Sequence, residues 1–232
     1  MSADQAYSLA DIELLAELPK ESLQALEKRC SWRNFSAQEQ IIDRQSTSRD
    51  IYFIVTGRVR VVNFSLSGRE VAFDEIPAGA YFGETAAIDG DPRSATVVSL
   101  GDTTVAIMSP ETFHSLLIEH PKVAFSLMVR MATIIRTSNE RIMDLSTLGA
   151  NNRVYAEILR LAKDDVSDSN TAKIRPIPIH GDIASRVSTT RETVARVLND
   201  LARKGLVKRE KDALHILDMT HLSEMVEQFQ ME

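Results

Sequence analysis

Residues 82–97, FGETAAIDGDPRSATV, carry the most specific pattern in the chain. Gly83 can adopt the left-handed backbone that ends a strand, and the ETAA after it is suited to begin a short helix. The unpaired N–H groups at such a helix start attract anions. The DGDP segment predicts a turn that brings Arg93 and Ser94 back towards the helix start. The pattern therefore predicts a pocket for a phosphate group.

The side chains around this turn suit a phosphorylated sugar. The Glu84 carboxylate can accept hydrogen bonds from two hydroxyl groups at once, and Arg93 presents a fixed fork of donors to a phosphate. Ser94 adds a neutral donor. The start of the helix would complete the predicted pocket with Gly83, Thr85 and Ala86. An ordinary hairpin with an exposed glutamate and arginine is the alternative, because a short motif is by itself a hypothesis.

The order Gly-Glu, turn, Arg-Ser-Ala resembles the phosphate-binding cassette of cyclic-nucleotide-binding domains. In that family the glutamate holds the ribose hydroxyl, the arginine pairs with the cyclic phosphate, and the small residue after it donates to the phosphate. The resemblance assigns these roles to Glu84, Arg93 and Ser94. Thr85 stands where the family usually has an aliphatic residue. The ligand that this resemblance implies is a cyclic nucleotide, with cAMP as the first candidate and cGMP as the second.

Length and composition describe a soluble protein of two domains. The 232 residues suffice for two cores, and 44% hydrophobic with 26% charged residues is a globular composition. No apolar run approaches the roughly 18 residues of a membrane span, and the N-terminus lacks the apolar core of a signal peptide. We therefore expect a cytoplasmic protein with no membrane partner.

The sequence shows no pattern of residues that is typical of a metal site or of covalent catalysis. Cys30 is the only cysteine, which excludes an intramolecular disulfide and a thiolate cluster for iron. The five histidines show no metal-ligand spacing. The sequence also has no nucleophile–base pair and no Walker loop. It therefore predicts neither a metal site nor an enzyme.

Charge is distributed unevenly along the chain. The formal net charge is −6, yet residues 173–211 carry ten Lys or Arg against four Asp or Glu. A local basic stripe is what contact with nucleic-acid phosphates requires, and the whole-chain charge hides it. This segment predicts double-stranded DNA as a partner.

The first half of the chain changes from helical to strand-like spacing. Residues 9–29 place leucine and isoleucine at helical intervals on both sides of Pro19, which predicts two short helices. Residues 35–108 consist of short apolar runs separated by turn residues, which predicts an antiparallel barrel or roll. Such a roll can enclose one small ligand, or it can be filled by its own side chains.

A long helix is predicted over residues 121–148, after a short helix that begins at Ser109 and Pro110. Its apolar residues follow a coiled-coil spacing, which predicts a parallel homodimer. The members of this predicted seam are Met128, Met131, Ile135, Ser138, Ile142 and Leu145. Ser138 is polar, so on these grounds alone it could simply set the register. Residues 149–152 are predicted to form a hinge.

The last third predicts a winged helix-turn-helix. Residues 179–187 and 191–204 have helical patterns, and residues 205–217 read as a two-stranded wing. Thr189 or Thr190 is expected to cap the second helix, and Thr189 with Glu192 fits a capping box. Ser188 occupies the turn position where glycine is usual, which costs strain if its φ is positive.

The second helix carries side chains suited to base edges. Arg191, Glu192 and Arg196 project from its first turn and a half, the part that enters a major groove. Lys208 and Arg209 in the wing are expected to hold backbone phosphates. A structural helical hairpin with a solvated charged face is the alternative for this segment.

The sequence RETVxR resembles the recognition helix of the Crp/Fnr family of regulators, and the order of pocket, long helix and helix-turn-helix is also that of this family. The resemblance implies TGTGA-like half-sites in an inverted repeat and RNA polymerase as a further partner. It also places Ser138 and Asn139 where the family has two hydroxyl residues that bond the purine, one from each subunit. Asn139 departs from the hydroxyl, so guanine stays open.

Together these patterns predict an α+β protein that regulates transcription as a homodimer. The expected domains are a ligand-binding roll (residues 1–120), a dimerisation helix and hinge (residues 121–150) and a winged helix-turn-helix (residues 151–232). The predicted DNA contacts are Thr189, Thr190, Arg191, Glu192, Arg196, Lys208 and Arg209. Alternatives keep the DNA function but respond to cGMP, to a cyclic dinucleotide or to no ligand. A nucleotide-binding module that controls a partner protein is an alternative of another class.

Overall fold

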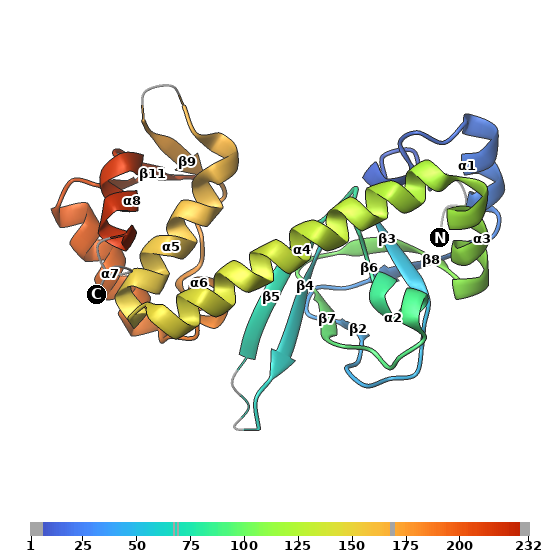
Figure 1. Ribbon diagram of the computed structural model, residues 1–232, viewed down its shortest axis with the longest axis horizontal. Helices are drawn as coiled ribbons and strands as arrows, with labels where there is room; N and C mark the ends of the chain where they lie inside the picture. Colours follow the sequence, from blue (N-terminus) through green and yellow to red (C-terminus); the bar gives the residue numbers. More distant parts are fainter. Residues whose placement is uncertain (1–6, 67, 69, 168–169, 228–232) are drawn as a thin grey trace. The chain divides into compact units, whose positions relative to one another are not determined.

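The computed structural model describes residues 7–66, 68, 70–167 and 170–227 (Figure 1). The chain divides into two compact units, Met1–Thr133 and Ile134–Glu232. The division falls inside helix α4 (Pro121–Thr147), whereas the sequence predicted boundaries near both ends of that helix. The three predicted domain ranges thus stay a prediction, and each compact unit is described by itself.

The first unit begins with two short helical segments, as the interrupted apolar spacing predicted. A 3₁₀ turn, η1, covers Glu13–Leu15, and α1 covers Lys20–Glu27 with Pro19 at its N-cap. Leu9, Leu15 and their apolar neighbours are buried against the following strands.

Two four-stranded antiparallel sheets form a roll, which confirms the predicted architecture. The first sheet has the order β1-β8-β3-β6 and the second has the order β2-β7-β4-β5. Their strands are β1 (Ser31–Phe35), β2 (Gln40–Ile42), β3 (Ile51–Thr56), β4 (Arg58–Phe64), β5 (Glu70–Pro77), β6 (Tyr81–Phe82), β7 (Thr96–Ser99) and β8 (Thr103–Met108). Strand β1 begins before the stretch of residues 35–108 in which the strands were predicted.

Strand β3 separates two cores within this unit. Its alternate side chains point to opposite faces of the sheet. Ile51 and Phe53 pack into the cluster that includes residues of η1, α3 and α4, whereas Tyr52 and Ile54 pack into the interior of the roll. The side chains of Tyr52 and Ile54 therefore face the interior of the roll.

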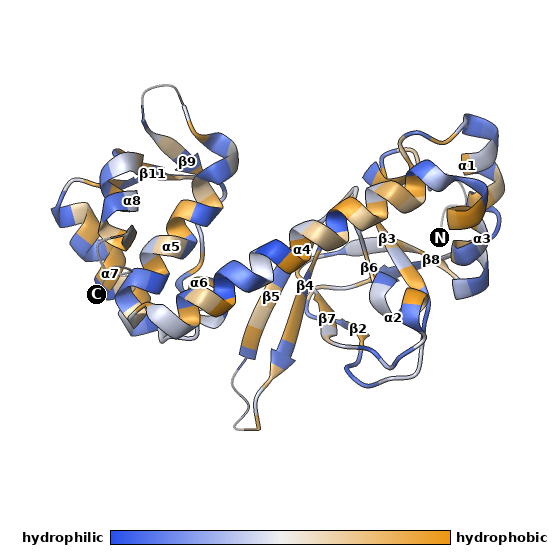
Figure 2. Cartoon of the chain, in the orientation of Figure 1, coloured by the Kyte–Doolittle hydropathy of each residue, from blue (hydrophilic) through white to orange (hydrophobic). Residues whose placement is uncertain are grey.

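Three helices complete the unit and lead out of it. A short helix, α2 (Glu84–Asp89), follows β6, and α3 (Pro110–Glu119) begins at Ser109, whose hydroxyl accepts from the Thr112 N–H at 3.3 Å. Helix α4 buries Val123 and Leu127 in the first unit. Hydrophobic residues recur at intervals along α4 (Figure 2).

The second unit contains the predicted helix-turn-helix and wing. After α5 (Ala150–Ala162) and the 3₁₀ turn η2 (Lys163–Asp165), the pair of helices is α6 (His180–Arg186) and α7 (Arg191–Arg203). A three-stranded antiparallel sheet follows the order β10-β11-β9. Its strands are β9 (Ala172–Ile174), β10 (Val207–Arg209) and β11 (Leu214–Ile216). An unpredicted helix, α8 (Met219–Glu227), ends the described chain.

Most of the segment that was predicted as a hinge is helical. Residues 150–152 are helical and belong to the first turn of α5, and Gly149 is its N-cap with φ −65° and ψ 161°. Only Leu148 and Gly149 therefore separate α4 from α5. The prediction of a hinge over residues 149–152 was wrong because small and polar residues are also acceptable in the first turn of a helix.

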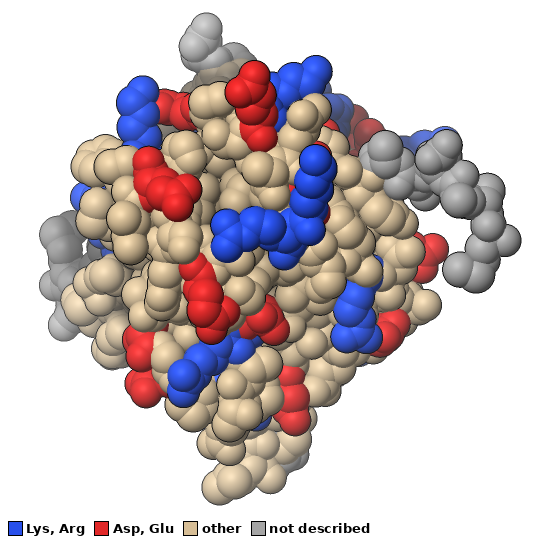
Figure 3. Space-filling model, turned by 90° about the vertical axis from the view of Figure 1, so that its right-hand side faces the viewer, with Lys and Arg blue, Asp and Glu red and all other residues tan. Residues whose placement is uncertain are grey.

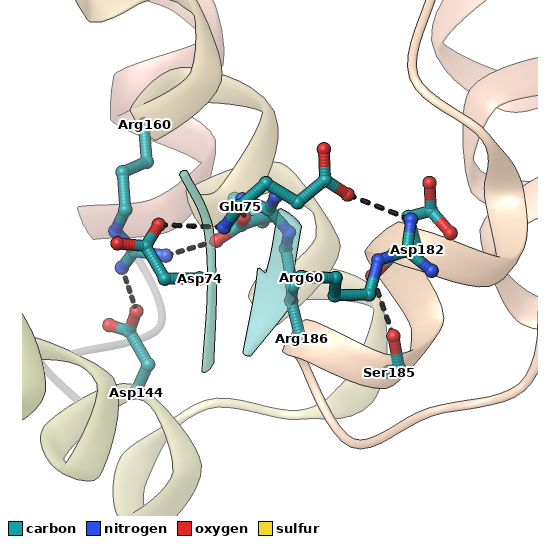
Figure 4. A network of polar contacts seen from close by, with 9 residues as sticks. Arg60, Asp74, Glu75, Asp144, Arg160, Asp182, Ser185 and Arg186 are labelled. Carbon is teal, nitrogen blue, oxygen red and sulfur yellow. Dashed lines mark hydrogen bonds and ion pairs between the residues drawn. The ribbon is translucent and has the colours of Figure 1, made fainter. Parts of the chain in front are cut away.

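A buried carboxylate joins three helices of the second unit. Glu157 on α5 is 1% exposed and forms ion pairs with Arg160 on α5 and with Arg186 on α6, the latter at 3.4 Å. Arg160 Nη2 also lies 2.7 Å from the Asp144 carboxylate on α4, a pair that Figure 4 shows. This network fixes the end of α4 against α5 and the first helix of the helix-turn-helix.

Candidate nucleotide pocket and DNA-binding surface

Gly83 makes the sharp transition from β6 to α2, as the sequence predicted. Its backbone is left-handed, with φ 85° and ψ 5°, and it is the N-cap of α2. A Cβ atom added at this position would lie 2.8 Å from Arg93 Nη1 and 3.0 Å from the Asp50 carbonyl oxygen. Real Cβ atoms essentially never approach other heavy atoms to 2.8 Å, so only glycine fits here.

Arg93 is held rigidly beside this turn. It is 4% exposed, and each of its three guanidinium nitrogens donates a hydrogen bond. Nε donates to Ser48 Oγ at 3.1 Å, Nη1 to the Gly83 carbonyl at 2.9 Å, and Nη2 to the Asp50 carbonyl at 2.6 Å. The guanidinium carbon also lies 5.6 Å from the centre of the Tyr52 ring. The protein's own acceptors thus fix the orientation of the fork.

The acceptors around Arg93 are all neutral. Within the described part of the chain, no carboxylate oxygen lies within 4.0 Å of its guanidinium nitrogens. Burial lowers the pKa of Arg93 from its usual value, and nearby Tyr52, Asp50 and Glu84 oppose this effect. Three of its five N–H groups are used. A buried cation with spare donors and no paired carboxylate favours binding of an anion.

Glu84 is the first residue of α2 and is half-buried. Burial raises the pKa of its carboxyl group, and its own backbone N–H, Arg130 and Arg93 act in the opposite direction. Glu84 directly follows Gly83, whose carbonyl accepts from Arg93, and its role as an acceptor of ribose hydroxyls stays a prediction. Ionised, this carboxylate accepts hydrogen bonds only.

The remaining predicted pocket residues differ in accessibility. Ser94 and Thr85 are exposed, whereas Ala86 is 4% exposed and lies on the buried side of α2. The Ser94 carbonyl accepts from Asn63 Nδ2 on β4 at 3.2 Å. The structure therefore leaves the Ser94 side chain open to solvent beside Arg93.

Ser138 and Asn139 lie on the part of α4 that follows Thr133 and belong to the second unit. Both are exposed. Their role as base contacts stays a prediction from the resemblance.

Sequence reasoning missed the residues that hold Arg93. Ser48, Asp50 and Tyr52 come from the β2–β3 loop and the start of β3, more than forty residues before Arg93. Two backbone hydrogen bonds attach this loop to the Arg93 peptide, from Arg93 N to the Ser46 carbonyl at 3.0 Å and from Gln45 N to the Arg93 carbonyl at 2.9 Å. A local motif has no signal for such partners, because they are defined by strand pairing.

The second helix of the helix-turn-helix begins one residue later than the capping box required. Thr190 is the N-cap of α7, and its hydroxyl accepts from the Thr193 N–H at 3.2 Å. The Thr189 N–H instead donates to the Ala184 carbonyl at 3.0 Å. The predicted capping box of Thr189 with Glu192 was therefore wrong. The Glu192 N–H and the Thr190 hydroxyl together lower the pKa of the Glu192 carboxyl.

The predicted base-reading side chains are all at the surface. Arg191, Glu192 and Arg196 are exposed on α7, while Val194 and Val197 on its other side are buried. A Cβ added to Gly181 would lie 2.8 Å from Arg191 Nε, which shows how closely Arg191 passes over α6. The helix thus buries its apolar face and presents the three charged residues to solvent.

The turn before α7 is strained, as its serine suggested. Ser188 has φ 52°, in the left-handed region that glycine adopts most easily. Arg153 at the start of α5 donates from Nε to the Val187 carbonyl at 2.8 Å, from Nη2 to the Ser188 carbonyl at 3.2 Å, and from Nη1 to the Leu148 carbonyl at 2.9 Å. One side chain therefore fixes both this turn and the end of α4.

The wing carries the other predicted DNA contacts. Lys208 and Arg209 are exposed on β10, and Lys208 Nζ lies 3.5 Å from Glu210. On the face of the molecule viewed in Figure 3, by contrast, acidic and basic side chains are interspersed. The local excess of basic residues comes from the segment that contains α6, α7 and the wing.

Family models match both units. A model of the cyclic nucleotide-binding domain matches residues 32–120, and a model of the Crp-like helix-turn-helix domain matches residues 152–225. The cyclic AMP receptor protein of Thermus thermophilus is 30% identical over 175 residues, which are 75% of this chain and 78% of that protein. The chain belongs to the Crp/Fnr family of transcription regulators.

A second curated relative and a solved structure are also similar to this chain. The cAMP-activated global transcriptional regulator CRP of Escherichia coli is 25% identical over 179 residues, 77% of this chain and 85% of that protein. A CooA mutant from Carboxydothermus hydrogenoformans has the same fold, with a TM-score of 0.81 and 21% identity over 93% of this chain and 96% of that one. As a Crp/Fnr regulator, the protein combines a cyclic nucleotide-binding domain with a helix-turn-helix domain and is not an enzyme.

Membrane spans and metal clusters are both missing from the described residues. No described helix is both long and apolar enough to span a membrane. In the same part of the chain, no three His, Cys, Asp or Glu side chains gather into a possible metal site.

Burial raises the pKa of the Cys30 thiol to about 11, so this thiol is protonated at neutral pH.

Proposed function

We propose that this Crp/Fnr regulator binds cAMP in the roll, dimerises through α4 and then binds DNA at an inverted repeat of TGTGA-like half-sites. The observation that carries the proposal is Arg93. It is buried, oriented by three neutral acceptors and unmatched by a carboxylate within 4.0 Å among the described residues. The cyclic phosphate would supply the missing negative charge.

The pocket chemistry supports a cyclic nucleotide in particular. Arg93 has two N–H groups left for phosphate oxygens, and Ser94 beside it offers a hydroxyl. Glu84 would accept from the ribose hydroxyl, while Gly83, Thr85 and Ala86 form the adjoining backbone. We choose cAMP because relatives in Thermus thermophilus and Escherichia coli are named for cAMP. Asn139 in place of a hydroxyl keeps cGMP as the comparison ligand.

Dimerisation is supported by exposed apolar residues on α4. Met128, Ile135 and Ile142 are 58%, 57% and 59% exposed and follow one another at seven-residue intervals, as in a coiled-coil seam. In the proposed dimer this seam is buried between two copies of α4. Ser138 lies in the same seam, and we propose that it and Asn139 contact the purine.

DNA binding is supported by the exposed charged face of α7. We propose that Arg191, Glu192 and Arg196 read base edges, each good pair being worth about 1–3 kcal/mol of discrimination. Thr189, Thr190, Lys208 and Arg209 would contact backbone phosphates, which adds affinity without sequence choice. The promoter-bound regulator would act on RNA polymerase.

Calorimetric titration with cAMP and cGMP tests the pocket. Replacing Arg93 with glutamine removes a cation that we expect to make two charge-assisted hydrogen bonds, so cAMP affinity should fall by about 100-fold. Arg44→Gln, an exposed arginine of the neighbouring loop, is the matched control and should stay within about twofold. Circular dichroism checks that both variants are folded.

Unchanged cAMP affinity in the Arg93→Gln variant would show that the pocket is assigned to the wrong residues. Absence of binding by the unmodified protein to either nucleotide would instead contradict the proposed ligand class. Titration with a cyclic dinucleotide would then distinguish a different ligand from a protein that binds DNA without one.

A further inference from the structure

The second unit contains a cavity whose lining residues belong to neither proposed binding surface. Its volume is about 410 Å³, within the usual range for small-molecule sites. Helices α7 and α8 both contact α5 (Figure 1), and the cavity is lined by the start of α5, the end of α7 and α8. Lys204, the C-cap of α7, lies about 20 Å along that helix from Arg191. The cavity is therefore separate from the base-reading end of α7.

The α5 wall of the cavity offers hydrogen-bond donors. Asn151 and Asn152 lie in the first turn of this helix, three and four residues before Tyr155, so all three line the same side. The N-cap is Gly149, which supplies no side-chain cap to the free N–H groups of that turn. A helix start of this kind favours a negatively charged ligand group.

Tyr155 gives independent support for a binding site. The residue is 8% exposed and lines the cavity, yet its hydroxyl makes no hydrogen bond with any residue that the structure describes. A tyrosine hydroxyl that is buried to this degree usually has a partner. The Tyr155 hydroxyl is thus available to a polar group of a ligand in the cavity.

Opposite charges meet at the other walls of the cavity. His221, Glu224 and Met225 lie three and four residues apart on one face of α8, and Lys204 adds an ammonium group from α7. Within the described chain, the side chains of Lys204, His221 and Glu224 form no ion pair or hydrogen bond. Charged side chains that line a cavity without protein partners are suited to pair with charged groups of a ligand.

We propose that this cavity binds a small zwitterion of the α-amino-acid class. The carboxylate lies between Lys204 and the start of α5, and the ammonium group lies against Glu224. The Tyr155 hydroxyl and the two asparagine amides add hydrogen bonds, and Met225 contacts the apolar part of the ligand. A zwitterion matches both the lysine and the glutamate, whereas a simple anion leaves the glutamate unpaired. This inference goes beyond the proposed function and does not rest on it.

Amide NMR of the isotope-labelled, full-length protein tests the site without cAMP or DNA. Each standard L-amino acid is added at millimolar concentration. We expect at least one of them to shift the amide resonances of Asn152, Tyr155 and Met225 in a saturable manner. The amide of Phe53, which is buried in the first unit, should not move. The absence of a saturable shift across the whole set would overturn the proposal.

Variants of the two charged residues test how the ligand is held. Lys204→Gln and Glu224→Gln should each weaken binding of the tightest amino acid by at least about tenfold, the expected loss for one hydrogen bond to a charged group. Lys163→Gln, the same replacement at an exposed lysine of η2, is the matched control and should stay within about twofold. Circular dichroism checks that all three variants are folded. Losses no larger than that of Lys163→Gln would contradict the proposed contacts.

Blocked ligands distinguish a zwitterion site from a simple anion site. The N-acetyl form of the same amino acid lacks the ammonium group and should bind about tenfold more weakly, a difference that should disappear in Glu224→Gln. Acetate and inorganic phosphate serve as anions without an ammonium group. Binding of the N-acetyl form, acetate or phosphate as tightly as the amino acid would show an anion site only and would overturn the proposal. Failure to bind cAMP or DNA contradicts the proposed function and leaves this test unchanged.

Discussion

Gly83 and Ser188 both hold left-handed backbones, with φ 85° and 52°, yet only one of them is glycine. At Gly83 a Cβ would collide with Arg93, so the pocket itself requires glycine. At Ser188 the backbone is left-handed although the residue carries a Cβ, which costs roughly 1–2 kcal/mol. The hydrogen bonds from Arg153 to the Val187 and Ser188 carbonyls offset part of this cost.

Ser188→Gly should therefore stabilise the second unit. Relief of the left-handed strain outweighs the extra chain entropy that glycine has in the unfolded state, for a net gain of about 0.5–1 kcal/mol. Native-state hydrogen exchange of the α7 amides measures the change locally. Ser185→Gly is the control, because the same replacement inside α6 should destabilise by about 1 kcal/mol. A loss of protection in Ser188→Gly would refute the strain argument.

At this scale the sequence predicted the residues with a local signature and missed those without one. Gly83, Glu84 and Arg93 were predicted together because they lie within one short motif. Ser48, Asp50 and Tyr52 contact Arg93 only because β3 pairs with β6 and the preceding loop pairs with the Arg93 peptide. Helical spacing likewise cannot show that the Arg130 guanidinium lies over the Tyr81 ring.

Secondary-structure elements were predicted where their apolar pattern was regular. Strand β1 was missed because its sequence, SWRNF, is mostly polar. The strand lies at the edge of its sheet, and Phe35 is its only buried residue. Strand β6 is too short for an alternation to be detected. Helix α8 was missed because it lies beyond the helix-turn-helix and wing from which the second unit was predicted. The long periodic helix α4 was predicted to end at residue 148, one residue beyond its observed end at Thr147.

The network around Glu157 shows how three elements depend on one another. A carboxylate that is 1% exposed is stable only when paired, and here Arg160 and Arg186 pair with it from α5 and α6. Arg160 also holds Asp144 at the end of α4. These ion pairs thus connect the helix-turn-helix, through α5, to the last turns of α4.

Glu157→Gln should destabilise the second unit by about 1.5–3 kcal/mol, because a neutral amide replaces the buried carboxylate that pairs with Arg160 and Arg186. Denaturation followed by far-ultraviolet circular dichroism measures this change. The control is Asp200→Asn, which breaks a more exposed ion pair with Arg203 and should cost less than about 1 kcal/mol. Equal losses in the two variants would show that Glu157 does not stabilise this junction.

At the scale of the whole molecule, the proposal places a ligand in one unit and DNA on the other. Such an arrangement is allosteric only if the two binding free energies are coupled, and that coupling is reciprocal. If cAMP favours the dimer that binds DNA, DNA must favour cAMP binding by the same factor. The continuous helix α4 supplies residues to both units, which makes it the element through which we expect the coupling to act.

Calorimetric titration of the full-length protein with cAMP, with and without a duplex that contains an inverted TGTGA repeat, tests this account most directly. We predict that the duplex tightens cAMP binding by a factor between about 5 and 150, the usual range of allosteric coupling. A duplex with scrambled half-sites should have a much smaller effect. Identical cAMP affinity with and without the specific duplex would contradict a nucleotide-controlled regulator.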